Sequence, residues 1–175
     1  MQEFDNNCTK GNAVACMTIA KLITNDYEIS KDYAKKSCEI IGIDECLNIA
    51  YLYIKGNKKT NKDIDLGYKI LDVTCDMGSA KGCEVLAYAY YNGSKVKKDR
   101  KIAFELNEIG CTNGSSQCCI MASYEYSQGN LTRQNYCKAK EFAGRACDLG
   151  NTNGCKIYKA LIIFCPIDPI IMPKF

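Results

Sequence analysis

Apolar residues recur along this chain with the spacing of an amphipathic helix, and the same stretch returns five times. Each copy begins at a cysteine and has mostly apolar side chains three, four and seven positions later, for example Leu86, Ala87 and Tyr90 after Cys83. At about 100° per residue, these positions and the cysteine share one face of a helix. The pattern predicts a helix after each of five cysteines: Cys16, Cys46, Cys83, Cys119 and Cys155.

A second cysteine precedes each of these helices, with seven residues between the two. The first cysteines of successive pairs are separated by 30, 37, 36 and 36 residues, a period typical of helical hairpin repeats. The pairs are Cys8/Cys16, Cys38/Cys46, Cys75/Cys83, Cys111/Cys119 and Cys147/Cys155.

Glycine and a capping residue stand between the cysteines of these pairs. After Cys75, for example, Gly78 is followed by Ser79. Glycine adopts the left-handed backbone that ends a helix, and serine caps the start of the next helix. We therefore expect one helix to end and another to begin inside every pair. In the second pair, Ile41 and Gly42 stand at this point.

A second helix completes each repeat. Gly93, ten residues after Cys83, ends the first helix, and Asp99 caps the helix that leads to Cys111. The same two signals recur in two other copies, at Gly56/Asp63 and Gly129/Asn135. The first copy lacks this glycine and is about six residues shorter, as is common in a terminal repeat.

Helix pairs of this kind cannot bury an apolar face alone, so neighbouring pairs stack into a solenoid. We therefore expect an all-α fold, with one domain over residues 1–165 built as an α-solenoid of four to five helix pairs. The repeat units are expected at about 8–37, 38–74, 75–110, 111–146 and 147–165. Residues 166–175 contain all three prolines and an apolar cluster. This tail either covers the end of the solenoid or makes a dimer contact, and we favour a monomer.

Thirteen cysteines in 175 residues bear on the compartment in which the chain works. So many cysteines are typical of compartments where disulfides persist, and we expect a periplasmic or secreted protein whose export signal has been removed from the mature chain. The alternative is a reduced intracellular protein. The net charge of +3 does not indicate nucleic-acid binding, and no apolar run reaches the roughly 18 residues of a membrane span.

The sequence contains no histidine, which excludes several kinds of catalytic and metal site. Ser-His and Cys-His nucleophile pairs cannot be built, nor can zinc sites with histidine ligands. An all-cysteine zinc site would need cysteines two to four residues apart, a spacing that C-x7-C does not provide. We therefore expect no metal and no cofactor.

The composite unit C-x-x-G-[NS]-x-x-x-C-x-x-[IL]-A-x-x-Y-x-x-G, followed by Lys-Asp before the next helix, resembles the Sel1-like repeat, a relative of the TPR. Its clearest copy, residues 75–111, reads CDMGSAKGCEVLAYAYYNGSKVKKDRKIAFELNEIGC. With a cysteine pair in every unit, residues 8–165 are similar to the Helicobacter cysteine-rich protein family of secreted Sel1-like repeat proteins. The resemblance implies a right-handed solenoid, export and a role in host or protein interaction. Some members of that family carry a penicillin-binding or β-lactamase label.

Each C-x7-C pair is expected to form a disulfide. The glycine turn between the two cysteines, which we call a corner, brings the last turn of one helix close to the first turn of the next. The residue numbers of Cys137 and Cys165 have the same sum as those of Cys147 and Cys155, so the two face each other across the same hairpin. We predict a sixth bridge between them. Cys118 is left over, either as a reactive or intermolecular thiol or as a buried apolar side chain.

Tyrosines occupy one outward position in three consecutive repeats. The fifth residue after the second cysteine lies about 150° from the apolar stripe. It is Tyr51, Tyr88 or Tyr124 in these repeats, and neighbouring outward positions hold Leu47, Tyr91 and Ile120. In such solenoids the first helix of each pair lines the concave side, where extended partners bind. We expect these residues to form a groove for a protein or peptide, although any one tyrosine could instead pack between repeats.

Two enzyme classes are the alternatives to a binding scaffold. A β-lactam hydrolase would use S-x-x-K, whose one match of interest is Ser94-Lys95-Val96-Lys97, in a loop and without S-D-N or K-T-G. A thiol-redox protein would be expected to carry C-x-x-C, which the sequence lacks. We therefore favour a protein-binding repeat scaffold without catalytic residues.

Overall fold

The computed structural model describes residues 2–57, 61–94 and 96–165. Within these ranges the chain forms ten α-helices, which confirms the predicted all-α class. Their bounds are α1 Gln2–Thr9, α2 Ala13–Leu22, α3 Tyr27–Ile41, α4 Ile43–Lys55, α5 Ile64–Asp76, α6 Ala80–Asn92, α7 Arg100–Thr112, α8 Ser116–Gln128, α9 Tyr136–Asp148 and α10 Thr152–Leu161. The tail predicted at 166–175 lies outside the described residues.

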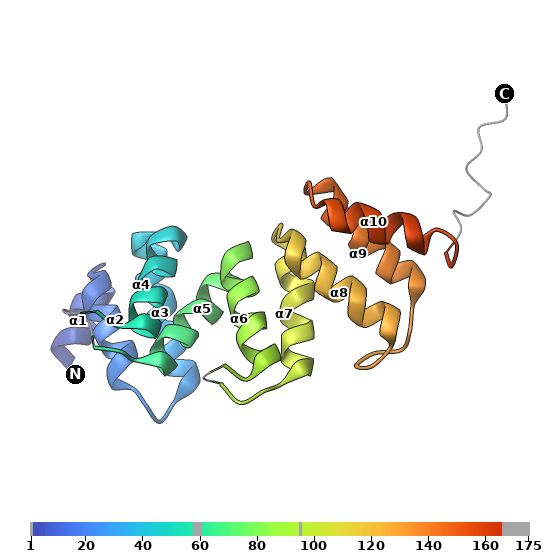
Figure 1. The fold of residues 1–175 in the computed structure, drawn as a ribbon. Coiled ribbons are helices and arrows are strands. Elements are labelled where there is room, and N and C mark those ends of the chain that lie inside the picture. The colour runs from blue at the N-terminus through green and yellow to red at the C-terminus, as the bar shows by residue number, and fades with distance from the viewer. Residues whose placement is uncertain (1, 58–60, 95, 166–175) are drawn as a thin grey trace.

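The helices follow one another along an elongated molecule, with α1 and α10 at opposite ends (Figure 1). The pairs are α2 with α3, α4 with α5, α6 with α7 and α8 with α9, and α10 packs against α9. One core cluster extends from α2 to α7, and another extends from α7 to α10. Each pair therefore buries apolar surface against the pairs before and after it, as in a solenoid.

Capping side chains start the helices where the sequence predicts them. Ser79 Oγ accepts a hydrogen bond from the Gly82 amide at the start of α6, and Asp99 Oδ1 accepts one from the Ile102 amide at the start of α7. Between α5 and α6, Gly78 has a φ of +97°, in the left-handed region that ends a helix. Local sequence thus fixes most of the helix boundaries.

The corner between α3 and α4 departs from the other four. α3 continues for 15 residues to Ile41, and Gly42 alone separates it from α4. Gly42 has a φ of +92° and offers α4 no side-chain cap. A single residue turns the chain here because glycine adopts a positive φ without steric penalty. The start of α3 has an additional cap, Asp26, whose Oδ1 accepts a hydrogen bond from the Ile29 amide.

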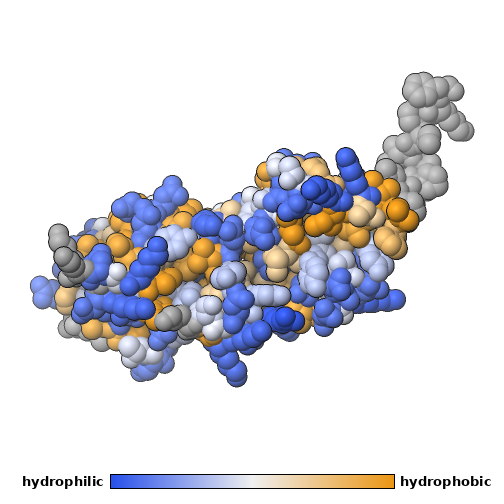
Figure 2. Space-filling view, in the orientation of Figure 1, coloured by the Kyte–Doolittle hydropathy of each residue, from blue (hydrophilic) through white to orange (hydrophobic). Residues whose placement is uncertain are grey.

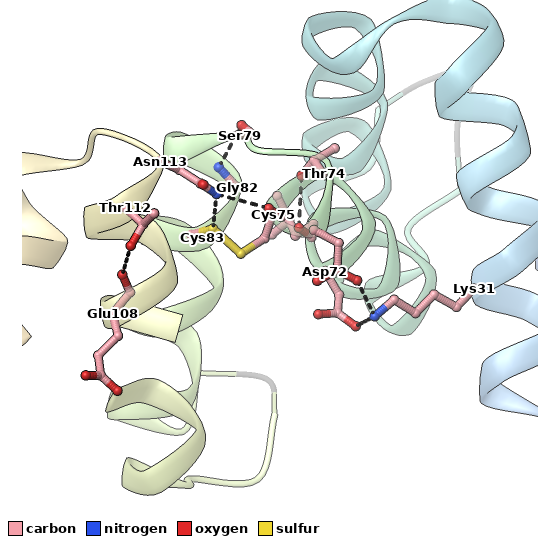
Figure 3. The surroundings of a disulfide bond; sticks show 12 residues. Lys31, Asp72, Thr74, Cys75, Ser79, Gly82, Cys83, Glu108, Thr112 and Asn113 are labelled. Atoms are coloured by element: carbon pink, nitrogen blue, oxygen red, sulfur yellow. Dashed lines mark hydrogen bonds and ion pairs between the residues drawn. A yellow bond between two sulfur atoms is a disulfide. The ribbon is translucent and has the colours of Figure 1, made fainter. Parts of the chain in front are cut away.

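Six disulfides join the helices, in the pairing that the sequence predicts. Five cross the corners, at Cys8–Cys16, Cys38–Cys46, Cys75–Cys83, Cys111–Cys119 and Cys147–Cys155. The sixth, Cys137–Cys165, ties the start of α9 to the segment after α10. Asn113, at the end of α7, donates from Nδ2 to Cys75 O at 3.1 Å and to Cys83 Sγ at 3.4 Å (Figure 3). This contact links one corner to the next.

Beside three of the corner disulfides, a single side chain fills the space where two helices cross. At two crossings it comes from the first helix and faces a glycine on the second: Thr74/Gly82 and Ala146/Gly154. At the α7–α8 crossing the order is reversed, because Cys118 of α8 fills the space and Gly110 of α7 leaves it open. A Cβ on Gly110 would lie 2.6 Å from Cys118 Sγ. Each crossing thus accommodates one side chain, from either helix.

The unpaired cysteine of the described chain is therefore a packing residue. Cys118 is 1% exposed, and burial raises the pKa of its thiol from an ordinary 9.0 to about 11. Because the thiolate is the reactive form of cysteine, a thiol buried in this way is a poor nucleophile.

Exchanging the two residues of the α7–α8 crossing tests this packing. Gly110→Thr alone forces a side chain into occupied space, so we expect the free energy of unfolding to fall by about 1–3 kcal/mol. Adding Cys118→Gly recreates the Thr74/Gly82 arrangement and should recover most of that loss. Urea unfolding followed by circular dichroism measures both variants. Equal stability of the single and double variants would rule out a shared space.

Thiol labelling tests the burial of Cys118. We expect iodoacetamide at pH 8 to label no cysteine in the native protein and one per chain in urea, as counted by mass spectrometry. The thiol pKa is higher in the folded than in the unfolded chain, so its contribution to stability is present below about pH 9 and is lost as the pH rises towards about 11. Rapid labelling of the native protein, or several labels in urea, would contradict this assignment.

Candidate ligand-binding groove

A cavity of about 430 Å³ opens between α6 and α8, with α7 as its third wall. Its lining is mostly apolar, with a few polar side chains, as is typical of ligand pockets. α6 contributes Glu84, Val85, Ala87, Tyr88, Tyr91 and Asn92, α7 contributes Asn107, and α8 contributes Gln117 and Met121. We call this cavity, with these nine residues, the α6–α8 groove.

Two of the tyrosines singled out in the sequence meet in the α6–α8 groove. Tyr88 is 68% exposed, while its neighbours Ala87 and Ala89 are buried, so the ring stands on the open side of α6. Tyr91 is half-buried, and the Arg100 guanidinium lies 5.1 Å from the centroid of its ring. This cation–π contact orients the Tyr91 ring at the mouth of the groove.

Tyr51 and Tyr124 occupy the same helix position as Tyr88 but do not line the cavity. Tyr124 is 51% exposed on α8. Tyr51 is half-buried on α4, with Lys55 Nζ 5.9 Å from its ring centroid, and burial raises the pKa of its hydroxyl. The row of tyrosines is therefore open over α6 and α8 and partly covered over α4.

The expectation that Leu47 and Ile120 point outward is corrected by the structure. Both are half-buried, Leu47 against the first core cluster and Ile120 against the second. Each directly follows a fully buried cysteine, and a rotation of about 100° from the core stripe leaves a long aliphatic side chain in contact with the adjacent helix. They support the wall of the solenoid more than they present a contact surface.

A second cavity, of about 480 Å³, lies between α2 and α4 beside the end of α3. Exposed apolar residues stand at its rim, with Val14 at 76% and Leu52 at 42% exposure. Lys21, at the position of the tyrosine row, also lines it. Figure 2 shows apolar surface over the N-terminal helices and again over the C-terminal pair. The first helices of the pairs therefore flank two separate cavities, one between α2 and α4 and the other between α6 and α8.

The sequence pattern did not reveal several groove residues, among them Glu84, Asn92, Gln117 and Asn107. Asn107 differs from the others in its helix. It stands four residues before Cys111, on the second helix of its pair, whereas the tyrosine row lies on the first helices. A signal was present, because the corresponding residues of three other repeats are apolar: Ala34, Leu71 and Ala143. A polar residue that interrupts an apolar position marks a candidate site.

The rival catalytic motif does not have the geometry that its chemistry needs. Ser94 lies in the turn after α6, its carbonyl accepting a hydrogen bond from the Tyr68 hydroxyl at 2.8 Å, whereas S-x-x-K enzymes place the serine at a helix start. Lys95 lies outside the described residues. In the part of the chain that the structure describes, no group of three acidic, cysteine or histidine side chains is arranged to hold a metal. No helix in these same ranges is long and apolar enough to span a bilayer.

Comparison with solved structures finds the same fold in bacterial repeat proteins. A Sel1 repeat protein from Oxalobacter formigenes matches with a TM-score of 0.59 at 17% identity, over 91% of this chain and 96% of that one. Cysteine-rich protein B of Helicobacter pylori matches with a TM-score of 0.53 at 27% identity, over 77% and 96%. The Escherichia coli protective antigen c5321 matches with a TM-score of 0.57 at 17% identity, over 88% of this chain and 34% of that one. No curated protein matches the sequence.

The family comparison agrees with these structures. The Sel1 repeat model matches residues 46–79, 80–115 and 116–151, which together make up more than half of the sequence. Each matched segment corresponds to one helix pair, α4–α5, α6–α7 or α8–α9, and the first begins inside α4. The likeness to H. pylori cysteine-rich protein B supports the expected resemblance to the cysteine-rich Sel1 proteins. This chain belongs to the Sel1 repeat family.

Proposed function

We propose that this chain is a periplasmic or secreted scaffold that binds a protein or peptide ligand in the α6–α8 groove. The observation that carries the proposal is an apolar cavity of about 430 Å³ with a 68% exposed tyrosine on its rim. Tyrosine favours interfaces because its ring buries a large area while its hydroxyl still finds a partner. Helical repeat arrays commonly bind partners along such surfaces.

The disulfides support the compartment in this proposal. Eight of the ten corner cysteines are buried, and each corner bridge spans a sequence separation of eight residues. Disulfides persist in the periplasm and outside the cell, and thiols stay reduced in the cytosol. A fold with a disulfide at each of its five corners therefore suits an oxidising compartment.

The same bridges also support binding by a preformed site. The groove is walled by α6, α7 and α8, and the corner disulfides Cys75–Cys83 and Cys111–Cys119 fix the starts of α6 and α8. A ligand that enters such a groove orders few protein groups, so less of the interaction energy is lost on binding.

Peptide selection tests the proposed function. Phage-displayed random dodecapeptides are panned on the oxidised protein, and the selected peptide is titrated by calorimetry. We expect Tyr88→Ala to weaken binding at least tenfold, because buried interface tyrosines commonly contribute more than 1 kcal/mol. Tyr124→Ala should weaken it less, because Tyr124 stands outside the cavity. The circular dichroism spectrum should stay unchanged, since both rings are exposed.

The matched control is Ile109→Ala. Ile109 is a 43% exposed apolar residue on α7, about 160° around the helix from Asn107, which lines the groove. Its loss should change the affinity less than twofold. The proposal is wrong if no peptide is enriched, or if Tyr88→Ala and Ile109→Ala bind the selected peptide as tightly as the unaltered protein.

A further inference from the structure

Asn107 is a buried polar residue at a position where the fold itself uses apolar side chains. It is 6% exposed, and the corresponding residues Ala34, Leu71 and Ala143 are 0% exposed. The helix pair therefore packs at this position without any polar group. Something other than packing is needed to explain an amide here.

No group in the described residues hydrogen-bonds to the side-chain amide of Asn107. A carboxamide has two donor hydrogens and an acceptor oxygen. Among the described residues, the fully buried side-chain polar atom without a hydrogen-bond partner is Glu125 Oε2, so the amide atoms of Asn107 are still reached by solvent. What remains of its exposed surface faces the α6–α8 groove, which it lines. The free donor and acceptor are thus available to a molecule in the groove.

The remainder of the groove presents little free charge. Its one carboxylate, Glu84, accepts from Lys81 Nζ at 2.6 Å and from Ser115 Oγ at 3.2 Å. Val85, Ala87 and Met121 are apolar, and Asn92 and Gln117 are neutral. Arg100 lies at the mouth, against the Tyr91 ring. Deeper in the groove a charged ligand would lose its hydration without gaining a counter-charge, so the interior matches an uncharged segment.

We propose that the groove binds an uncharged, extended peptide segment and that Asn107 recognises its backbone. This rests on the proposed function and adds the ligand class and the recognising residue. One peptide unit of the ligand donates its N–H to Asn107 Oδ1 and accepts from Asn107 Nδ2 through its carbonyl. An apolar side chain of the same segment packs against Tyr88 and Met121. A carboxamide suits this role because a peptide unit likewise offers one donor and one acceptor.

Substitution of Asn107 separates this role from a structural one. Asn107→Leu introduces the residue found at position 71, and Asn107→Ala the residue found at 34 and 143. We expect both variants to unfold at about the same urea concentration as the unaltered protein, because no hydrogen bond within the described residues is lost and apolar side chains pack at this position in three other repeats. Both should bind the phage-selected dodecapeptide at least tenfold more weakly. A structural role would predict the opposite, lower stability with unchanged affinity.

Backbone methylation of the peptide identifies the bond itself. The selected dodecapeptide is synthesised with single N-methyl groups at successive positions, and each version is titrated by calorimetry. One position should weaken binding to the unaltered protein at least tenfold but change binding to Asn107→Leu less than twofold, because the bond is already absent in that variant. A control position in the same peptide should affect both proteins equally.

The outcomes distinguish this inference from the proposed function. If Tyr88→Ala weakens binding while Asn107→Leu and Asn107→Ala bind as tightly as the unaltered protein, the groove binds peptides and Asn107 does not recognise them. If the selected peptides are charged and their affinity falls steeply with salt, the uncharged ligand class is wrong. If no peptide is selected, the proposed function and this inference both fail.

Discussion

The corner disulfide is the constraint on which the rest of this structure depends. A solenoid buries each helix only against its neighbours, so it gathers less core per residue than a globular domain of the same length. Each corner bridge closes a loop with a sequence separation of eight residues. In the chain-entropy model, closure of so short a loop contributes roughly 2–3 kcal/mol. Repeated at five corners, this compensates for the thin core and holds successive pairs at fixed angles.

Fixing the corners has a consequence for packing. With the sulfur bridge in place, two helices cross so closely that only one further side chain fits beside it, whether Thr74, Cys118 or Ala146. The thirteenth cysteine is therefore a small apolar side chain that fills a gap, since cysteine is among the residue types most often fully buried. The Cys118 sulfur fills space in the packing, whereas the other cysteines of the described chain form disulfide bonds.

The same rigidity gives the α6–α8 groove its form. α6 and α8 do not collapse onto each other, because α7 stands between them and the corner bridges hold their first turns. The groove that remains is largely apolar on its sides, and the buried residue Asn107 lines it with a neutral amide. The groove thus offers a largely apolar surface with a few polar side chains.

Helix boundaries, caps and cysteine pairs follow from the sequence alone, because each depends on residues a few positions apart. Gly78 and Ser79 turn one corner, Asp99 starts a helix, and the equal spacing of the cysteines determines their pairing. Even the Cys137–Cys165 bridge follows from counting along one hairpin.

The exposure of each residue in the tyrosine row was decided only by the tertiary structure. Tyr51 and Tyr88 hold the same place in their repeats, yet one is half-buried and the other is 68% exposed. The difference arises because exposure depends on which side chains the neighbouring repeats bring against a helix, and those residues are some 36 positions away in the chain. Asn107 shows the same limit. Its residue type can be read from the sequence, but only the packing of α6 and α8 around α7 shows that the residue is largely buried and that it lines the groove.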